Sequence, residues 1–244
     1  MRHWQFTGPF ISAAARPMAC VLAAVLLGAT IGATTAPGVP AGSSVSRPQR
    51  GPVVIKDRSD DSPLVLNQPV DYILRNVAVA GVRDNAALTL AGKVQSVRIF
   101  NGRFGDVLGG PNGRAAALDA AGANVATFVA TDSQFYDAEN QLASLRDGTF
   151  GTVRFERCAF RTSEPFLKQL YARSPWRAWP PVTEFFNIDR LELLDNSYEN
   201  TIVVIHPSVK HVVIRGDAPQ IQVQGRETQV IRLEAAPAGM ASPA

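Results

Sequence analysis

The stretch Thr152-Val-Arg-Phe-Glu-Arg-Cys-Ala-Phe160 carries the pattern on which the rest of the chain is built. Apolar Val153 and Phe155 alternate with charged residues, and this period of two is typical of a β-strand with one buried face. The polar Arg157 follows the strand, and the aromatic Phe160 closes the unit. We therefore expect Val153, Phe155 and Phe160 to face one common core.

The same outline recurs along the chain. Aligned on the closing apolar residue, successive units lie 25, 31, 25 and 38 residues apart, which indicates a repeat of about 25 residues with two insertions. The closing residues are Val79, Phe104, Phe135, Phe160 and Tyr198. Two apolar columns precede them, at five residues (Leu74, Ile99, Ala130, Phe155, Leu193) and at seven (Tyr72, Val97, Phe128, Val153, Leu191). A polar column lies three residues before each: Asn76, Asn101, Asp132, Arg157 and Asp195.

A second short strand precedes most units after a small turn. These strands are expected in Leu88–Gly92, Ala117–Gly122, Leu142–Gly148 and Val203–Ile205, with an early unit in Val53–Leu66 and a late one in Val212–Gly216. One unit is too thin to bury both of its faces, so the units must stack to form a core. Six or seven coils at about 4.8 Å each give a rod about 30 Å long.

The pattern of strand, glycine turn, strand and Asn/Asp-x-x-aromatic resembles that of right-handed parallel β-helix proteins, the fold of pectate lyases, over roughly Val70 to Val223. The resemblance implies an all-β, short, single-stranded right-handed parallel β-helix of about six to seven coils with one helical, tryptophan-containing insertion. The handedness comes from the resemblance alone. An antiparallel sandwich is the alternative, but the in-phase columns favour the solenoid. The fold is used by enzymes, adhesins and binding modules alike, so function has to be argued from a site.

The N-terminus has the organisation of a secretory signal. Arg2 and Arg16 precede an apolar run, Met18–Ala33, and small residues follow it. We expect a signal peptide in 1–36, with an uncleaved anchor as the alternative. The apolar run is shorter than the about 20 residues that a bilayer span needs, which favours the signal peptide over the anchor. A flexible linker (37–51), the β-helix domain (52–234, with the insertion at 163–181) and a disordered tail (235–244) should follow. The chain is thus expected in the periplasm or outside the cell, without a membrane span unless the signal is retained.

The balance of charged residues and the small number of potential metal ligands narrow the possible functions. Without Arg2 and Arg16 the chain has 22 basic and 21 acidic residues, a balance that argues against nucleic acid as a partner. Cys158 would be the one thiol after export, and a small buried filler is its simplest interpretation. His206 and His211 lack a third ligand in the sequence, so we expect no metal and no cofactor.

The polar column has two interpretations. Asp132 and Asp195 would flank a cation or form an acid pair, or the whole column would satisfy backbone groups at a turn. We favour the structural role, because Arg157 lies between the two aspartates in the stack and is expected to neutralise them.

The outward face of the same strands combines arginines with aromatic residues. Arg98 and Phe100 are candidate carbohydrate-binding residues, since a guanidinium binds a sugar carboxylate and a ring stacks on a sugar face. Resemblance to the lyases suggests an arginine base, which makes Arg154, with Glu156, the catalytic candidate. The simpler interpretation, which we favour, is a solvated face with lateral salt bridges.

The insertion gives the third candidate site. Ser163–Arg173 is expected to form a short helix with Ser163 as its cap, followed by a loop that contains Trp176, Arg177 and Trp179. These three residues form a candidate carbohydrate-binding platform, unless the rings fold down to cover the side of the rod.

Three functions follow from these sites. The first is an exported binding or structural module for polysaccharide or cell-envelope material. The alternative is a small lyase or hydrolase acting on an acidic polysaccharide through the arginine-bearing face, and the second alternative is a protein-assembly scaffold docked through open coil ends. The sequence leaves the oligomeric state open. Both sugar hypotheses lose most of their support if Arg98, Arg154 and the tryptophan loop lie on different faces instead of bordering one concave surface.

Overall fold

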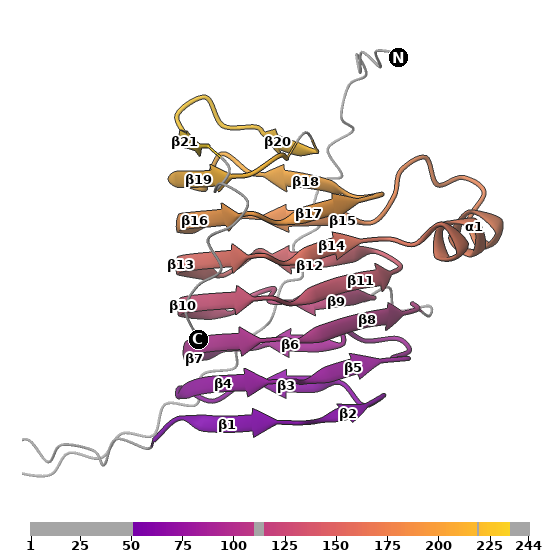
Figure 1. The fold of residues 1–244 in the computed structure, drawn as a ribbon, viewed down its shortest axis with the longest axis horizontal. Helices are drawn as coiled ribbons and strands as arrows, with labels where there is room; N and C mark the ends of the chain where they lie inside the picture. The colour runs from indigo at the N-terminus through magenta and orange to yellow at the C-terminus, as the bar shows by residue number, and fades with distance from the viewer. Residues whose placement is uncertain (1–50, 110–114, 219, 235–244) are drawn as a thin grey trace, which may run out of the picture. The chain divides into compact units, whose positions relative to one another are not determined.

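The computed structural model describes residues 51–109, 115–218 and 220–234. The expected signal or anchor (1–36), the linker apart from Gly51, and the tail (235–244) lie outside these residues. The described part is all-β apart from one helix, and its strands form three sheets of stacked parallel strands (Figure 1).

Sheet A contains β1 (Val53–Lys56), β4 (Asp71–Arg75), β7 (Lys93–Phe100), β10 (Asn124–Thr131), β13 (Thr149–Glu156), β16 (Ile188–Leu194), β19 (His211–Arg215) and β21 (Gln229–Leu233). Sheet B contains β2 (Ser59–Asp60), β5 (Ala78–Ala80), β8 (Arg103–Val107), β11 (Gln134–Ala138), β14 (Ala159–Arg161) and β17 (Ser197–Glu199). Sheet C contains β3 (Leu64–Leu66), β6 (Leu88–Leu90), β9 (Ala116–Asp119), β12 (Gln141–Leu145), β15 (Val182–Phe185), β18 (Ile202–Ile205) and β20 (Ile221–Val223).

From β1 to β18 the chain visits the three sheets in turn, so each of these coils places one strand in sheet A, one in sheet B and one in sheet C. The last part of the described chain adds β19 and β21 to sheet A and β20 to sheet C. Every strand pair recorded in the described residues is parallel, as in the β10 to β13 and β11 to β14 pairs. The arrangement is consistent with a parallel β-helix, and the antiparallel sandwich is wrong. The sequence indicated two strands per unit, but the closing residue lies in a third strand, the one in sheet B.

The strand register confirms the apolar columns. Val153 pairs with Phe128 on one side and Leu191 on the other, and Phe160 pairs with Phe135 and Tyr198. Apart from the partly buried Tyr198, these side chains are almost fully buried. Stacking of like residues on like positions therefore builds the hydrophobic core.

The polar column lies at the corner where the chain passes from sheet A to sheet B. All five residues have a φ between 50° and 53°, in the left-handed region, which Asn and Asp tolerate better than most residues do. Asn101 donates from Nδ2 to Asn76 Oδ1 over 3.0 Å, and Asn76 donates to Asp57 Oδ1 over 2.9 Å. The structural interpretation of the column is thus supported by side-chain bonds between successive coils.

The charges of the column are paired differently from the prediction. Arg157 binds Asp132, with Nε 2.7 Å from Oδ1, but Asp195 is paired with Arg215, whose Nη2 is 2.6 Å from Oδ2. Arg157 therefore neutralises one aspartate and not both. The late coil supplies the second arginine from the end of β19, a residue that the alignment of columns did not connect with Asp195.

The helix α1 (Glu164–Arg173) interrupts the passage from β14 to β15. Its predicted cap is confirmed, because Ser163 accepts a hydrogen bond from Phe166 N, and Glu164 and Pro165 occupy the first turn. Phe166 and Leu170 bury one face of the helix. Within the described residues, no helix has the length and hydropathy that a membrane crossing requires.

Candidate binding sites

The outer face of sheet A carries a network of ion pairs centred on Glu156. Arg154 Nη2 lies 2.5 Å from Glu156 Oε2, Arg157 Nη1 lies 2.8 Å from Oε1, and Arg215 Nη2 lies 3.8 Å from Oε1. The Glu156 side chain retains only 17% of its exposure. These contacts are the lateral salt bridges that the sequence suggested for this face.

The catalytic candidates are thus engaged with each other. Arg154 contacts Glu192 as well, with Nη1 3.7 Å from Oε2, and Glu192 also binds Arg190. A guanidinium remains protonated in proteins, so Arg154 forms ion pairs with both neighbouring carboxylates. The geometry gives Arg154 the role of a charge partner within the sheet.

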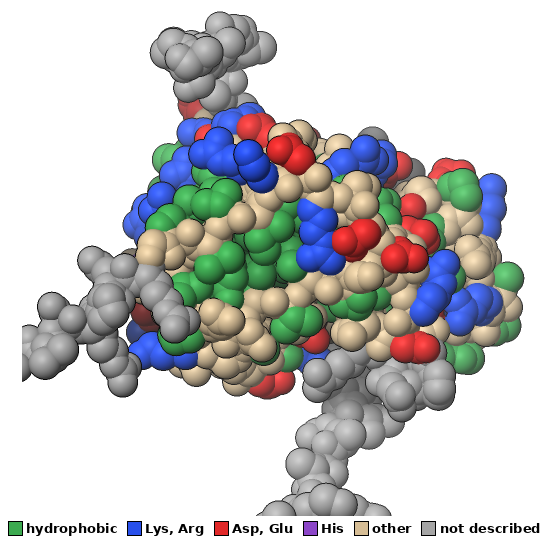
Figure 2. All heavy atoms as spheres, turned by 90° about the horizontal axis from the view of Figure 1, so that it is seen from below, with side chains coloured by type: hydrophobic (Ala, Val, Ile, Leu, Met, Phe, Trp, Pro, Cys, Tyr) green, Lys and Arg blue, Asp and Glu red, His purple; other side chains and the backbone are tan. Residues whose placement is uncertain are grey.

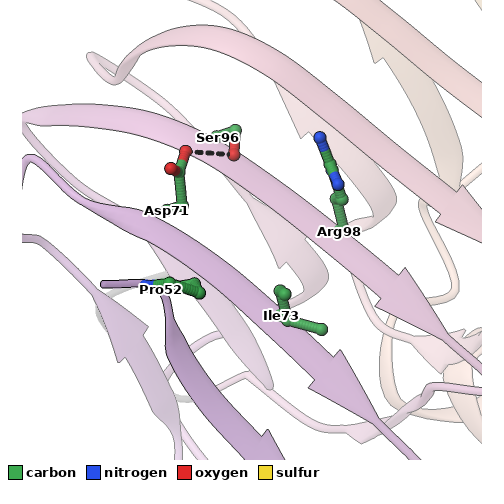
Figure 3. Close-up of a pocket in the computed structure, with 5 residues that line it drawn as sticks. All are labelled: Pro52, Asp71, Ile73, Ser96 and Arg98. Atoms are coloured by element: carbon green, nitrogen blue, oxygen red, sulfur yellow. Dashed lines mark hydrogen bonds between the residues drawn. The ribbon is translucent and has the colours of Figure 1, made fainter.

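The other candidates on this face, Arg98 and Phe100, lie on β7. Phe100 is covered by the guanidinium of Arg75, whose central carbon is 5.1 Å from the ring centroid, so this ring already has a partner. Arg98 lines a small pocket together with Pro52, Asp71, Ile73 and Ser96 (Figure 3).

The loop after α1 holds two exposed tryptophans. Trp176 is 82% exposed and Trp179 is 56% exposed, so the rings do not fold down onto the stack. Arg177 joins the two halves of the loop: its Nε donates to Trp179 O over 3.1 Å, and its backbone N donates to Ser174 O over 3.0 Å.

The insertion is fixed at both of its ends. At its start, Asp137 accepts hydrogen bonds from the backbone N and the hydroxyl of Ser163, over 2.6 and 2.9 Å. At its end, the buried hydroxyl of Thr201 donates to Pro181 O over 2.9 Å. The loop is therefore held by contacts to the coils on both sides of it.

Charges also bind the helix to the loops beneath it. Arg173 lies 3.6 Å from Glu139 Oε2 and donates to the carbonyl of Gly109. Burial lowers the pKa of Arg177 from its usual value, although Glu139 and Tyr171 act in the opposite direction. Sequence reasoning missed Asp137 and Glu139, since their role depends on the coil that precedes the insertion.

The predicted site residues do not share one surface. Arg98, Phe100, Arg154 and Glu156 belong to sheet A, whereas the tryptophan loop connects β14 of sheet B with β15 of sheet C. Figure 1 shows α1 projecting at the right, with the first halves of β7, β10 and β13 at the left. The structure thus separates the two sets of sugar-binding candidates, so the sugar hypotheses lose the support of a shared surface and rest on each set by itself.

The remaining reactive side chains have structural roles. Cys158 is 1% exposed, and burial raises the pKa of its thiol to about 12. His206 stacks on Phe186, with ring centroids 4.4 Å apart. In the described ranges, no group of three His, Cys, Asp or Glu side chains is placed to hold a metal ion.

The fold and the sites together define a scaffold of stacked parallel strands with a projecting aromatic loop. No protein-family model, curated protein or solved structure matches the chain. Its function is therefore argued from its own residues.

Proposed function

We propose that this protein is an exported binding module for polysaccharide or other cell-envelope material, built on a right-handed parallel β-helix of the kind found in pectate lyases. The exposure of Trp176 and Trp179 on an anchored loop supports the proposal most strongly. Export is supported by the signal-like composition of residues 1–36.

Two exposed tryptophan side chains leave a large apolar area in contact with water, and this is unfavourable unless a ligand covers the rings. A Trp side chain buries on the order of 150–250 Å² when it finds a partner, and two exposed rings within four residues of one loop offer that area to a ligand. The indole face stacks on the C–H face of a sugar, and Arg177 lies between the two rings in the sequence. The loop therefore presents two stacking faces beside a cation.

The anchoring of the loop favours binding over simple flexibility. Ser163 and Pro181 are held at the two ends, and Arg177 bridges Ser174 and Trp179. A platform that is ordered before binding loses less conformational entropy when its ligand arrives. This is the arrangement expected for recognition by a few aromatic residues.

The two loop tryptophans also provide a direct readout. The chain contains three Trp residues, so Trp4→Phe leaves fluorescence that comes from the loop alone. In this background, addition of a polysaccharide that stacks on the loop should shift the emission to shorter wavelength. Neutral polysaccharides, acidic polysaccharides and an isolated cell-envelope fraction are to be compared.

Substitutions in the loop test the assignment. Trp176→Ala and Trp179→Ala should each weaken retention by the bound polysaccharide about tenfold or more, and Trp→Phe should restore part of it. Arg161→Ala, on the outer side of sheet B, is the matched control. Unchanged affinity in the Ala double variant, or no ligand in the whole panel, would overturn the proposal.

The same panel discriminates the enzymatic alternative. A lyase acting on an acidic polysaccharide through Arg154 would release unsaturated products that absorb in the ultraviolet, and Arg154→Ala would abolish them. The binding proposal expects retention of polysaccharide without product. The pairing of Arg154 with Glu156 and Glu192 is the observation that places binding first.

The exposed ends of the stack favour an assembly scaffold as a second candidate. Val53, Val54 and Val65 of the first coil are 38%, 53% and 49% exposed, and Figure 2, which views the stack from this end, shows hydrophobic side chains gathered there. At the other end Val230 and Ile231 are 38% and 55% exposed.

The partner proposed for these ends is a second copy of the chain. β1 and β21 are the two edges of sheet A, and Val230 and Ile231 continue the columns of Val53 and Val54. A head-to-tail stack would therefore extend the same ladder. Arg232 continues the column of Ile55 and would bring a charge to the junction between two copies. Charged residues at a strand edge disfavour pairing with another strand, so we rank this candidate second.

Light scattering over a range of concentrations tests this candidate. Concentration-dependent association that Val54→Lys reduces at least tenfold would support it, with Val129→Lys in the middle of sheet A as the control. A monomer at all concentrations would overturn it.

A further inference from the structure

The outer face of sheet A contains a pocket that none of the functions above uses. Its volume is about 110 Å³, and it is lined by Pro52, by Asp71 and Ile73 of β4, and by Ser96 and Arg98 of β7. Typical ligand pockets have about 300–1,000 Å³. This one therefore has room for one small molecule or one end of a larger molecule.

Arg98 differs from the other arginines that face outward from sheet A. Arg154, Arg190 and Arg215 pair with carboxylates, and Arg75 lies over a ring. Among the described residues, Arg98 has no hydrogen bond, ion pair or ring contact. Its neighbours on the adjacent strands are apolar, Ile73 on β4 and Val129 on β10, so its guanidinium fork is left for a ligand.

Asp71 supplies the opposite charge in the same pocket. Its Oδ1 accepts a hydrogen bond from the Ser96 hydroxyl over 2.5 Å. In the described part of the chain that hydroxyl is its one partner, and no cation pairs with it. Figure 3 shows Asp71 and Ser96 turned toward each other, while Arg98 extends outward farther along β7. The second carboxylate oxygen remains as an acceptor.

The register sets the spacing of these two charges. Asp71 pairs with Ser96, and Arg98 lies two residues farther along the same strand. At about 3.3 Å per residue along a strand and about 4.8 Å between strands, the two Cα atoms are about 8 Å apart. In the described residues no ion pair joins Asp71 and Arg98, and Ile73, which pairs with Arg98 across the strands, lies two residues after Asp71 on β4.

We propose that this pocket binds a small zwitterion, with its carboxylate on Arg98, its ammonium group on Asp71 and its carbon chain against Ile73 and Pro52. A singly charged anion would pair with Arg98 but would be repelled by the negative charge of Asp71. A singly charged cation would pair with Asp71 but would be repelled by the positive charge of Arg98. A ligand with both charges satisfies both groups with charge-assisted hydrogen bonds. This inference goes beyond the tryptophan loop and does not depend on it.

A series of ω-amino acids tests the pocket and its charge spacing. Glycine, β-alanine, 4-aminobutyrate and 5-aminopentanoate are titrated into the full-length chain, and binding is followed by NMR through the Arg98 Nε–Hε resonance and through the backbone amides of Ile73 and Ser96, which are also present in Arg98→Gln. Butyrate and butylamine are the singly charged controls. One member of the series should bind at least tenfold more tightly than either control.

Substitutions assign each charge. Arg98→Gln should weaken the best ω-amino acid about tenfold or more and abolish its preference over butylamine. Asp71→Asn should also weaken the binding of the best ω-amino acid and should abolish the preference for that amino acid over butyrate. Arg161→Gln on sheet B, and the Trp176→Ala and Trp179→Ala variants, should leave this binding unchanged.

Two outcomes would overturn the proposal. The first is that butyrate binds as tightly as every ω-amino acid and Asp71→Asn has no effect, which would reduce the pocket to an anion site. The second is that no ω-amino acid shifts the Arg98 resonance. Since Arg98 is exposed and without a partner in the described residues, Arg98→Gln is expected to fold, and its circular dichroism confirms this before binding is compared.

Discussion

The rings of Phe155 and Phe160 meet edge to face in the core, with centroids 5.2 Å apart and planes at 68°. They are five positions apart in the sequence, yet Phe155 belongs to β13 of sheet A and Phe160 to β14 of sheet B. The corner at Arg157, with a φ of 50°, turns the chain so that both rings point inward. A local turn therefore brings two apolar columns into contact.

Phe155 contacts four aromatic rings, those of Phe128, Phe135, Phe160 and Phe185. We predict that Phe155→Ala lowers the free energy of unfolding by about 3–5 kcal/mol, because the truncation leaves a cavity at the centre of the stack. Chemical denaturation measures this loss. Phe100→Ala, on the outer face of the same sheet, should cost less than half as much; equal losses would contradict the assignment of Phe155 to the core.

The corner ladder predicts an order of stability at Asn101. Its φ is 53°, and its amide donates to Asn76. Asn101→Gly and Asn101→Ala both remove that bond, but only Ala has a Cβ that resists the left-handed conformation, at about 1 kcal/mol. Asn101→Ala should therefore be about 1 kcal/mol less stable than Asn101→Gly in urea denaturation. Equal stability of the two variants would argue against strain at this corner.

Glu156 is the acidic centre of three arginines on sheet A. We predict that Glu156→Gln destabilises the fold by about 1–2 kcal/mol at low salt, because three neighbouring guanidinium groups lose their shared counter-charge. Thermal unfolding at rising NaCl concentration should show this loss shrinking. Arg190→Gln removes a more exposed pair and should cost under about 1 kcal/mol; the reverse order would contradict the central role of Glu156.

The thiol of Cys158 and the hydroxyl of the partly buried Tyr198 are both buried acids, and they predict a loss of stability at alkaline pH. Burial raises the pKa of Cys158 from 9.0 to about 12 and raises the pKa of Tyr198 above its usual value of 10.0. The unfolded chain releases these protons at lower pH than the folded chain does. Stability should therefore be unchanged below about pH 9 and fall above it, by up to about 1.4 kcal/mol per pH unit for each group.

Guanidinium denaturation between pH 7 and pH 10.5 measures this decline. Cys158→Ala removes the thiol, so its stability should fall less steeply than that of the wild type above pH 9. A wild-type profile that rises with pH, or identical slopes in the two proteins, would show that the thiol is not buried as described.

The candidate site was predictable from the sequence only in part. The helix at Ser163–Arg173 and the salt bridges of sheet A followed from local composition and from the repeat, whereas the exposure of Trp176 and Trp179 was left open by the sequence and decided by the structure. The contacts by which Asp137 and Glu139 fix the insertion could not be predicted from the sequence, because they join one coil to the next at a corner. The pocket at Asp71 and Arg98 likewise depends on two strands lying side by side.

The stretch Thr152–Phe160 and its four aligned counterparts determined the repeat and its core columns, because period-two alternation fixes which side chains point inward once a strand forms. The polar residue before each aromatic marked the corner, because few residue types tolerate a positive φ. Only the tertiary structure decided that each coil has three strands, that Asp195 pairs with Arg215, and that the tryptophan loop and the sheet A arginines lie apart. These relations depend on register and on the direction of each corner, which a one-dimensional pattern does not encode.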